Sequence, residues 1–265
     1  MKKLWLLPIG ACLLAAVSAQ AEISRQDILN KIASNYQNVQ EFSGEIEIGM
    51  SMMGTTMKTP CQFWQKGKQF RMNTLVQQPG MPQPMEQNML FDEKGLTIYQ
   101  KTLNTVMTVD FARLPAEMRD QIKKQQTFFD PNNMTREIGK ILDDTDLSEK
   151  SRDGRKFYVF DIKDLKKVAQ NVPANLRQQA ALFKRMMVWV DQANYFPSRI
   201  EFYADAEQPG MWMDIKNFKA GPVNASLFTL DIPKDAKTMD MTDMLVNMSK
   251  QMKKGDSTAA ETGKK

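Results

Sequence analysis

Methionine side chains supply the most distinctive chemistry in this sequence. Residues 49–58 read GMSMMGTTMK and contain four methionines, Met50, Met52, Met53 and Met57. Thioethers are soft ligands that select Cu(I), and the unbranched, polarizable methionine side chain also suits surfaces that accept varied apolar ligands. Three interpretations therefore stay open: a Cu(I) site, an adaptable apolar lining, and the filling of gaps in an ordinary core.

The spread of methionine along the chain favours an apolar lining over a metal site. Met211 and Met213 lie far from the 49–58 cluster, and further methionines follow near the C-terminus. The chain has no histidine, which is the commonest ligand of transition metals and the commonest general base. We therefore expect no metal site, no cofactor and no Ser-His or Cys-His catalysis.

Two groups of carboxylates could serve catalysis or calcium binding, but each also has a purely structural interpretation. Glu45 and Glu47 are about 6.6 Å apart along a strand, a separation that could suit paired carboxylate catalysis. They alternate with Ile46 and Ile48, so a solvated strand face explains them more simply. Residues 143–146 read DDTD and resemble part of a calcium loop, but the glycine and the closing spacing of an EF-hand are missing. We expect a helix end and turn there, and no enzyme.

The N-terminus has the pattern of a secretory signal peptide. Lys2 and Lys3 precede an apolar stretch over residues 4–17, and residues 19–21 read AQA, with small side chains where a signal peptidase reads them. We predict that residues 1–21 are cleaved and that the mature protein is soluble outside the cytoplasm.

Cys12 offers an alternative, because residues 9–12 loosely resemble a lipoprotein cleavage box. The apolar stretch continues past Cys12, which fits an ordinary signal peptide better. If Cys12 leaves with the signal, Cys61 is the only cysteine that remains, so no intramolecular disulfide forms and core burial must carry the stability. The formal net charge of +5 is modest and the charges are interspersed, so we expect no nucleic-acid partner.

Apolar periodicity predicts a helix followed by a long antiparallel sheet. Residues 24–36 combine a capping-box-like start with apolar residues on one helical stripe. From Phe42 the apolar period becomes two, which is typical of a strand with one buried face. Strand-like segments follow at 58–65, 69–76, 88–91, 96–100, 105–111, 156–162, 187–190, 198–203, 211–218 and 227–230. Tight turns without βαβ alternation predict an α+β fold with a mainly antiparallel sheet and helices gathered on one side.

Helical patterns lie in the middle and at the end of the chain. Two segments with thin apolar faces lie between residues 115 and 142, and methionines recur at helical spacing near the C-terminus. We divide the chain into a signal peptide at 1–21, one domain at 22–238, a Met-rich amphipathic helix at 239–254 and a disordered tail at 255–265.

Motifs along the chain resemble those of the outer-membrane lipoprotein-sorting (LolA-like) superfamily. The closing motifs are VWVD at 188–191, FPSRIEF at 196–202, IKNF at 215–218 and SLFTLDIP at 226–233. Earlier, WQKGKQFRM at 64–72 and GRKFYV at 154–159 are similar to two further motifs of that superfamily. The resemblance spans about residues 42–237 in order.

This resemblance implies an unclosed half β-barrel of about eleven antiparallel strands, with helices that lid an apolar cavity, in the periplasm of a diderm bacterium. It also implies a carrier that shields lipid or lipoprotein acyl chains in transit between membranes. Its partners would be an inner-membrane donor complex and an outer-membrane acceptor. The alternative is an envelope sensor that detects lipid and signals to a protein partner. We expect a monomer.

On this interpretation, strand alternation and the motifs select the residues of the site. The side chains expected to line the apolar cavity are Ile46, Ile48, Met50, Met52, Phe70, Met72, Trp189 and Met213. The side chains expected to form the lid are Leu114, Met118, Ile122, Met134 and Ile138. Weak apolar contact would let such a lid lift, and methionine would make the cavity wall pliable.

Overall fold

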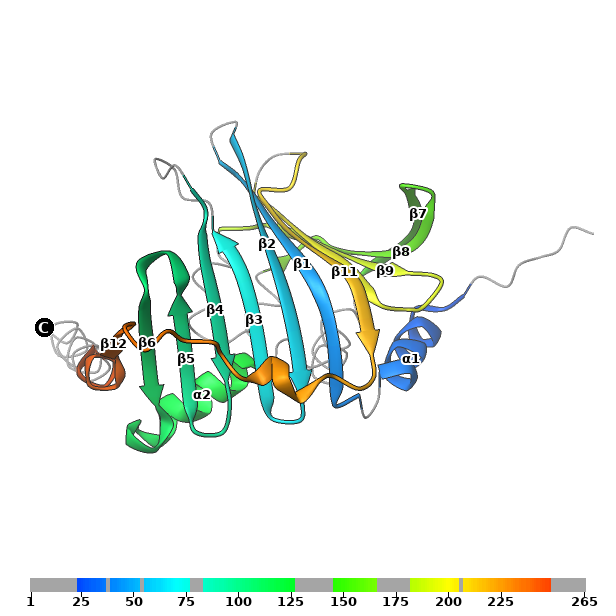
Figure 1. The fold of residues 1–265 in the computed structure, drawn as a ribbon. Helices are drawn as coiled ribbons and strands as arrows, with labels where there is room; N and C mark the ends of the chain where they lie inside the picture. Colours follow the sequence, from blue (N-terminus) through cyan, green and yellow to red (C-terminus); the bar gives the residue numbers. More distant parts are fainter. Residues whose placement is uncertain are drawn as a thin grey trace, which may run out of the picture.

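One twelve-stranded sheet forms the centre of the molecule (Figure 1). The computed structural model describes residues 23–36, 39–52, 55–76, 83–126, 145–165, 182–204 and 207–248. The strands are β1 (Glu41–Met52), β2 (Thr55–Lys66), β3 (Gln69–Val76), β4 (Met85–Phe91), β5 (Gly95–Gln100), β6 (Thr105–Asp110), β7 (Asp146–Arg152), β8 (Arg155–Ile162), β9 (Arg185–Asp191), β10 (Pro197–Tyr203), β11 (Met211–Ala220) and β12 (Lys237–Asp240). Their order in the sheet is β12-β6-β5-β4-β3-β2-β1-β11-β10-β9-β8-β7.

The sheet is antiparallel except at one edge, where β12 pairs parallel with β6. Its two end strands, β12 and β7, lie at opposite ends of the strand order, so the sheet is unclosed. The predicted α+β fold with a half-barrel sheet is therefore confirmed.

Strand periodicity missed both edge strands. β7 has six exposed residues of seven and all four residues of β12 are exposed, so neither shows the apolar alternation of a half-buried strand. The segment predicted as a strand at 227–230 instead begins within a 3-10 helix, η4 (Ala225–Phe228). The side chain of Asn224 accepts a hydrogen bond from Ser226 N at 3.0 Å and so caps that short helix.

The first helix, α1 (Arg25–Tyr36), begins with the predicted capping box. Ser24 Oγ accepts from Asp27 N at 3.1 Å, and Asp27 Oδ2 accepts from Ser24 N at 3.3 Å. These reciprocal bonds satisfy backbone donors that a helix start leaves free. The helix then buries Ile28, Leu29, Ile32 and Tyr36.

The main core lies on one face of the sheet, which we call the inner face. It is the face to which Ile46 of β1, Phe70 of β3 and Met213 of β11 point, and α1 packs there with the buried residues just given. The second helix, α2 (Ala116–Gln126), also contributes partly buried side chains to this core. We call the opposite side of the sheet the outer face.

Residues 221–236 cross the outer face on the way from β11 to β12. In Figure 1 this segment passes in front of the strands. Arg71 of β3 donates from Nη1 to the Leu227 carbonyl at 2.6 Å, and Lys66 of β2 donates to the Val223 carbonyl at 3.1 Å. The segment thus holds the outer face of β2 and β3 by hydrogen bonds and leaves the inner face to the helices.

The C-terminal helix begins at Thr242 and is described through residue 248. Thr242 is fully buried, and its hydroxyl accepts from Asp110 N at 2.9 Å. Met239, which the sequence places in this helix, belongs to β12 instead. The rest of the predicted Met-rich helix, the predicted tail at 255–265 and the predicted signal peptide at 1–21 lie outside the described residues.

Candidate functional site: the inner face of the sheet

Cross-strand register aligns apolar side chains in rows across the inner face. One row runs from the core to the free edge through β2, β3, β4, β5, β6 and β12. Its members are Phe63, Met72, Met89, Ile98, Met107 and Met239. Phe63 is buried at one end and Met239 is 52% exposed at the other. The inner face is therefore continuous with the core and reaches solvent at its edge.

The inner face also reaches solvent at the far end of β1. Ile46 is buried, but Ile48 and Met50, which follow on the same side of the strand, are each 36% exposed. A one-sided strand shows this gradient when the helices and loops over it end before the strand does. The exposed end is apolar, so water covers it at a cost in free energy.

The predicted cavity residues other than Trp189 divide into three groups. Ile46, Phe70 and Met213 lie on the inner face but are packed in the core. Ile48 and Met50 are the half-exposed pair, and Met72 is partly buried against the core. Met52 ends β1, paired with Thr55, and the placement of its side chain lies outside what the structure describes.

The prediction that Trp189 lines the cavity is corrected by the structure, because its side chain belongs to the outer face. It packs with a separate cluster of Phe157, Val159, Met187 and Tyr203. Its neighbours along β9, Val188 and Val190, are the ones that point into the main core. Periodicity of two assigned the strand correctly, but both faces of β9 are apolar, so hydrophobicity alone selected the wrong face.

Three of the five predicted lid residues lie within the part of the chain that the structure describes. Leu114 is buried, and Met118 and Ile122 of α2 are partly buried against the main core. Met134 and Ile138 lie outside the described residues. The part of the predicted lid that is described therefore does lie on the inner face.

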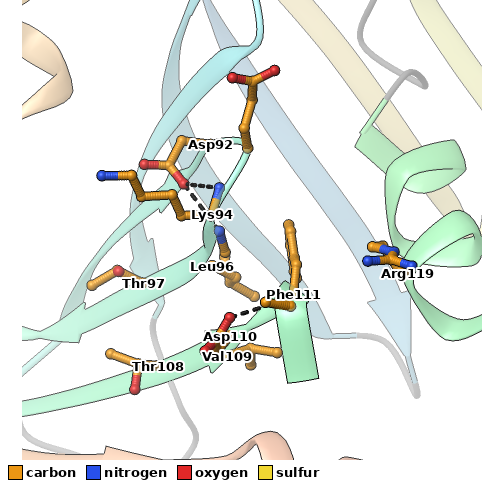
Figure 2. Close-up of a pocket in the computed structure, with 12 residues that line it drawn as sticks. Asp92, Lys94, Leu96, Thr97, Thr108, Val109, Asp110, Phe111 and Arg119 are labelled. Atoms are coloured by element: carbon orange, nitrogen blue, oxygen red, sulfur yellow. Dashed lines mark hydrogen bonds between the residues drawn. The ribbon is translucent and has the colours of Figure 1, made fainter. Parts of the chain in front are cut away.

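A pocket of about 730 Å³ lies where α2 meets the ends of β5 and β6 (Figure 2). Leu96, Val109 and Phe111 line it with apolar surface, whereas Asp92 and Arg119 bring charge. Both aspartates at its wall have structural tasks: Asp92 accepts from Lys94 N at 2.8 Å, and Asp110 accepts from Ala112 N at 2.9 Å. These bonds hold a turn and a 3-10 helix, η2 (Phe111–Arg113), so this pocket offers no free carboxylate pair for catalysis.

A charged network lies on the outer face of β9, β10 and β11. Glu201 accepts hydrogen bonds from Trp189 Nε1 at 2.7 Å, Tyr203 Oη at 2.8 Å and Arg199 Nε at 2.6 Å. Arg199 also pairs with Asp214. Burial and the hydrogen bond to Glu201 raise the pKa of Tyr203 to about 12. All the groups are paired, so the network fixes the strands and is not free for acid–base chemistry.

A second pocket, of about 320 Å³, lies above this network. Its deeper wall carries Asp214 and Glu47, whose side chains are 17% and 25% exposed, and its rim carries Arg155 and Lys58, which are both 57% exposed. Neither the network nor this pocket was predicted from the sequence. One signal in the sequence could have indicated them. Charged residues alternate with apolar ones in the SRIEF stretch and beside Asp214.

Buried sulfur and clustered acids offer no further reactive centre. Burial raises the pKa of the Cys61 thiol, which keeps it protonated and unreactive. Among the described residues, no group of three or more His, Cys, Asp or Glu side chains could hold a metal ion. Likewise, none of the described helices is long and apolar enough to span a membrane.

By its sheet and inner face, the chain is an open half-barrel of the α+β class. No protein-family model matches it, and no curated protein matches it. Solved structures do match. An uncharacterized conserved protein from Thermus thermophilus is 14% identical, with 81% of this chain and 98% of that chain covered and a TM-score of 0.46.

Two further solved structures match at a similar level. LprF from Mycobacterium bovis is 14% identical, with coverage of 80% and 96% and a TM-score of 0.44. A LolA superfamily protein from Nitrosomonas europaea is 14% identical, with coverage of 79% and 99% and a TM-score of 0.32. The superfamily that the sequence motifs resemble is thus represented among the matched structures. At these identities the likeness concerns the fold alone.

Proposed function

We propose that this protein is a periplasmic binding protein that shelters lipid or lipoprotein acyl chains in transit between membranes, by binding and without catalysis. The observation that carries the proposal is the half-exposed apolar end of the inner face at Ile48 and Met50. An acyl chain in water costs about 0.8 kcal/mol per CH2 group, so a carrier needs apolar surface that is both continuous with its core and open to the ligand. The motif resemblance supports the same function.

Methionine suits this use of the inner face. The side chains of Met50, Met72, Met89 and Met107 point to it from four strands. Unbranched thioether chains repack around ligands of different shape, so one face can accept acyl chains of several lengths. In the proposed cycle, an inner-membrane donor loads the inner face and an outer-membrane acceptor empties it.

A pair of matched aspartate substitutions tests the binding surface. Ile48→Asp places a charge on the exposed inner face, and Leu75→Asp places one on the outer face of β3, where Leu75 is 44% exposed. We expect Ile48→Asp to weaken binding of a fluorescent fatty acid by the delipidated protein at least about tenfold, and Leu75→Asp to leave it unchanged. Equal binding by both variants, or no binding by the wild-type protein, would contradict the proposal.

A second candidate function is an envelope lipid sensor that signals to a protein partner. The second pocket, on the outer face, favours this function. Its exposed cationic side chains lie above aromatic and carboxylate side chains and form a surface suited to a protein partner. Transfer of the fluorescent fatty acid between donor and acceptor vesicles distinguishes the two. A carrier accelerates the transfer in proportion to its concentration, whereas a sensor that only detects lipid does not.

A further inference from the structure

Three methionines that are distant in the sequence lie side by side on three adjacent strands. Met50 of β1 pairs directly with Met57 of β2 on one side and with Met211 of β11 on the other. The dispersion of methionine along the sequence favoured an apolar lining over a metal site. The sheet register removes that objection, because it brings residue 211 next to residues 50 and 57.

All three thioether side chains point to the inner face. Met50 follows Ile46, which is packed in the core, with no register shift in between, and Met211 precedes Met213, which is packed there too. Directly opposed side chains in an antiparallel sheet have Cβ atoms about 4.5–5.5 Å apart. The outer two side chains are therefore about 10 Å apart at Cβ, and the three rotatable bonds of each let both sulfurs lean toward the central one.

The surroundings of these three methionines suit a soft monovalent ion. On the inner face the neighbouring cross-strand row is Thr59, Ile48 and Met213, which carries no charge. On the β11 side, Met211 pairs with Phe202 of β10. Hard cations such as Ca²⁺ bind oxygen ligands, whereas neutral thioethers select Cu(I). Met50 is 36% exposed, so an ion can reach the sulfurs from solvent.

We propose that Met50, Met57 and Met211 form a Cu(I) site with three thioether ligands at the open end of the inner face. This function is additional to acyl-chain binding. Copper binds and leaves as Cu(I), so no electron transfer is involved. Ag(I), which has the same charge and similar softness, binds in the same place.

The same face offers a matched control. Met72 and Met89 are also direct cross-strand partners, but the next position in their row is Ile98, and Met107 lies one strand further away. This second group therefore presents two adjacent thioethers and not three. Substitution of Met by Leu removes the sulfur and keeps most of the volume and hydrophobicity, which cores usually tolerate.

The test is an anaerobic titration of the purified protein with Cu(I) in the presence of ascorbate and a chromophoric Cu(I) chelator as competitor. We expect one Cu(I) per chain, and a weakening of at least about tenfold for each of Met50→Leu, Met57→Leu and Met211→Leu, since each removes one ligand of three. Met72→Leu and Met89→Leu should bind as the wild type does. In a protein with 13C-labelled methionine methyl groups, Ag(I) should shift three methyl resonances.

Three outcomes would overturn the proposal: no competition for Cu(I), an undiminished affinity in the triple Leu variant, or an equal loss in the control variants. Fatty acid binding by the wild-type protein, measured in parallel, keeps the two functions apart. Copper binding that is lost in the three Leu variants of the site and kept in Met72→Leu and Met89→Leu supports a separate metal site. A protein that binds fatty acid and no copper retains the proposed carrier function but excludes this site.

Discussion

At the scale of single residues, the outer face contains a buried ion pair whose groups depend on each other. Arg199 and Glu201 have side chains only 9% and 7% exposed, and they form an ion pair with each other. A carboxylate removed from water is tolerated only when its oxygens are fully hydrogen-bonded. Glu201 meets this condition through Trp189, Tyr203 and Arg199.

Removal of the Glu201 carboxylate should therefore cost much more than removal of a surface charge. We expect Glu201→Ala to lower the free energy of unfolding by about 3–5 kcal/mol, because it breaks a buried pair and leaves three donors without their acceptor. Urea unfolding measures this change. Glu149→Ala, at an exposed carboxylate of β7, is the control and should stay within about 0.5 kcal/mol of the wild type. Similar midpoints for the two variants would show that the network adds no stability.

At the scale of elements, polar contacts fix the C-terminal helix to the sheet edge. Asp240 Oδ1 accepts from Thr242 N at 2.9 Å and caps the helix start. Arg113, just before α2, pairs with Asp240 and, at 2.7 Å, with Asp243. Met241 and Leu245 pack against the core, whereas Met244 and Met248 remain exposed. The predicted methionine face is thus divided between the core and solvent.

The docking of this helix should weaken in acid. Hydrogen bonds from Thr242, and then the one from Arg113, lower the pKa of Asp240 to about 2. A folded-state pKa below the ordinary value of about 3.9 means that the stabilisation is present above that pH and is lost as pH falls through about 2. Hydrogen exchange at the amides of residues 242–248 should therefore be less protected at pH 2 than at pH 5, relative to the β1–β2 amides. In Asp240→Asn, protection should already be low at pH 5. An unchanged pH response in that variant would exclude the Asp240 carboxylate as the cause.

At the scale of the whole molecule, an unclosed sheet presents two free edges. Edge strands are templates for pairing with other chains unless charged side chains or short length prevent it. β7 reads DLSEKSR and is almost entirely exposed, and β12 has only four residues. Both edges thus have the features that prevent association.

These edges predict a monomer that becomes associative when the charges of β7 are removed. We expect light scattering to give the mass of one chain for the wild type, and a mass that rises with concentration for the double variant Glu149→Val, Lys150→Val. The control is Lys68→Val, Glu93→Val, which removes an exposed ion pair and adds the same apolar side chains away from the sheet edges. Association of both double variants would indicate simple surface hydrophobicity, and association of neither would remove β7 as a pairing edge.

The amino-acid sequence is enough to predict the elements whose cause is local. The capping box at Ser24, the strand alternation from Phe42 and the α+β antiparallel class all follow from contacts between residues close in the chain. It also selected Ile48, Met50 and Met72 as inner-face residues, because apolar side chains of one parity must face one side.

Long-range pairing, in contrast, sets which face those residues occupy and which residues lie beside them. Trp189 lies on the outer face because its neighbours Val188 and Val190 point into the main core, and periodicity cannot distinguish the two faces of β9 since both are apolar. The edge strands β7 and β12 exist through backbone pairing with β8 and β6, since their side chains carry no burial signal. Met211 joins Met50 and Met57 for the same reason: hydrogen-bond register between distant strands, set by long-range pairing, brings together residues that the sequence separates.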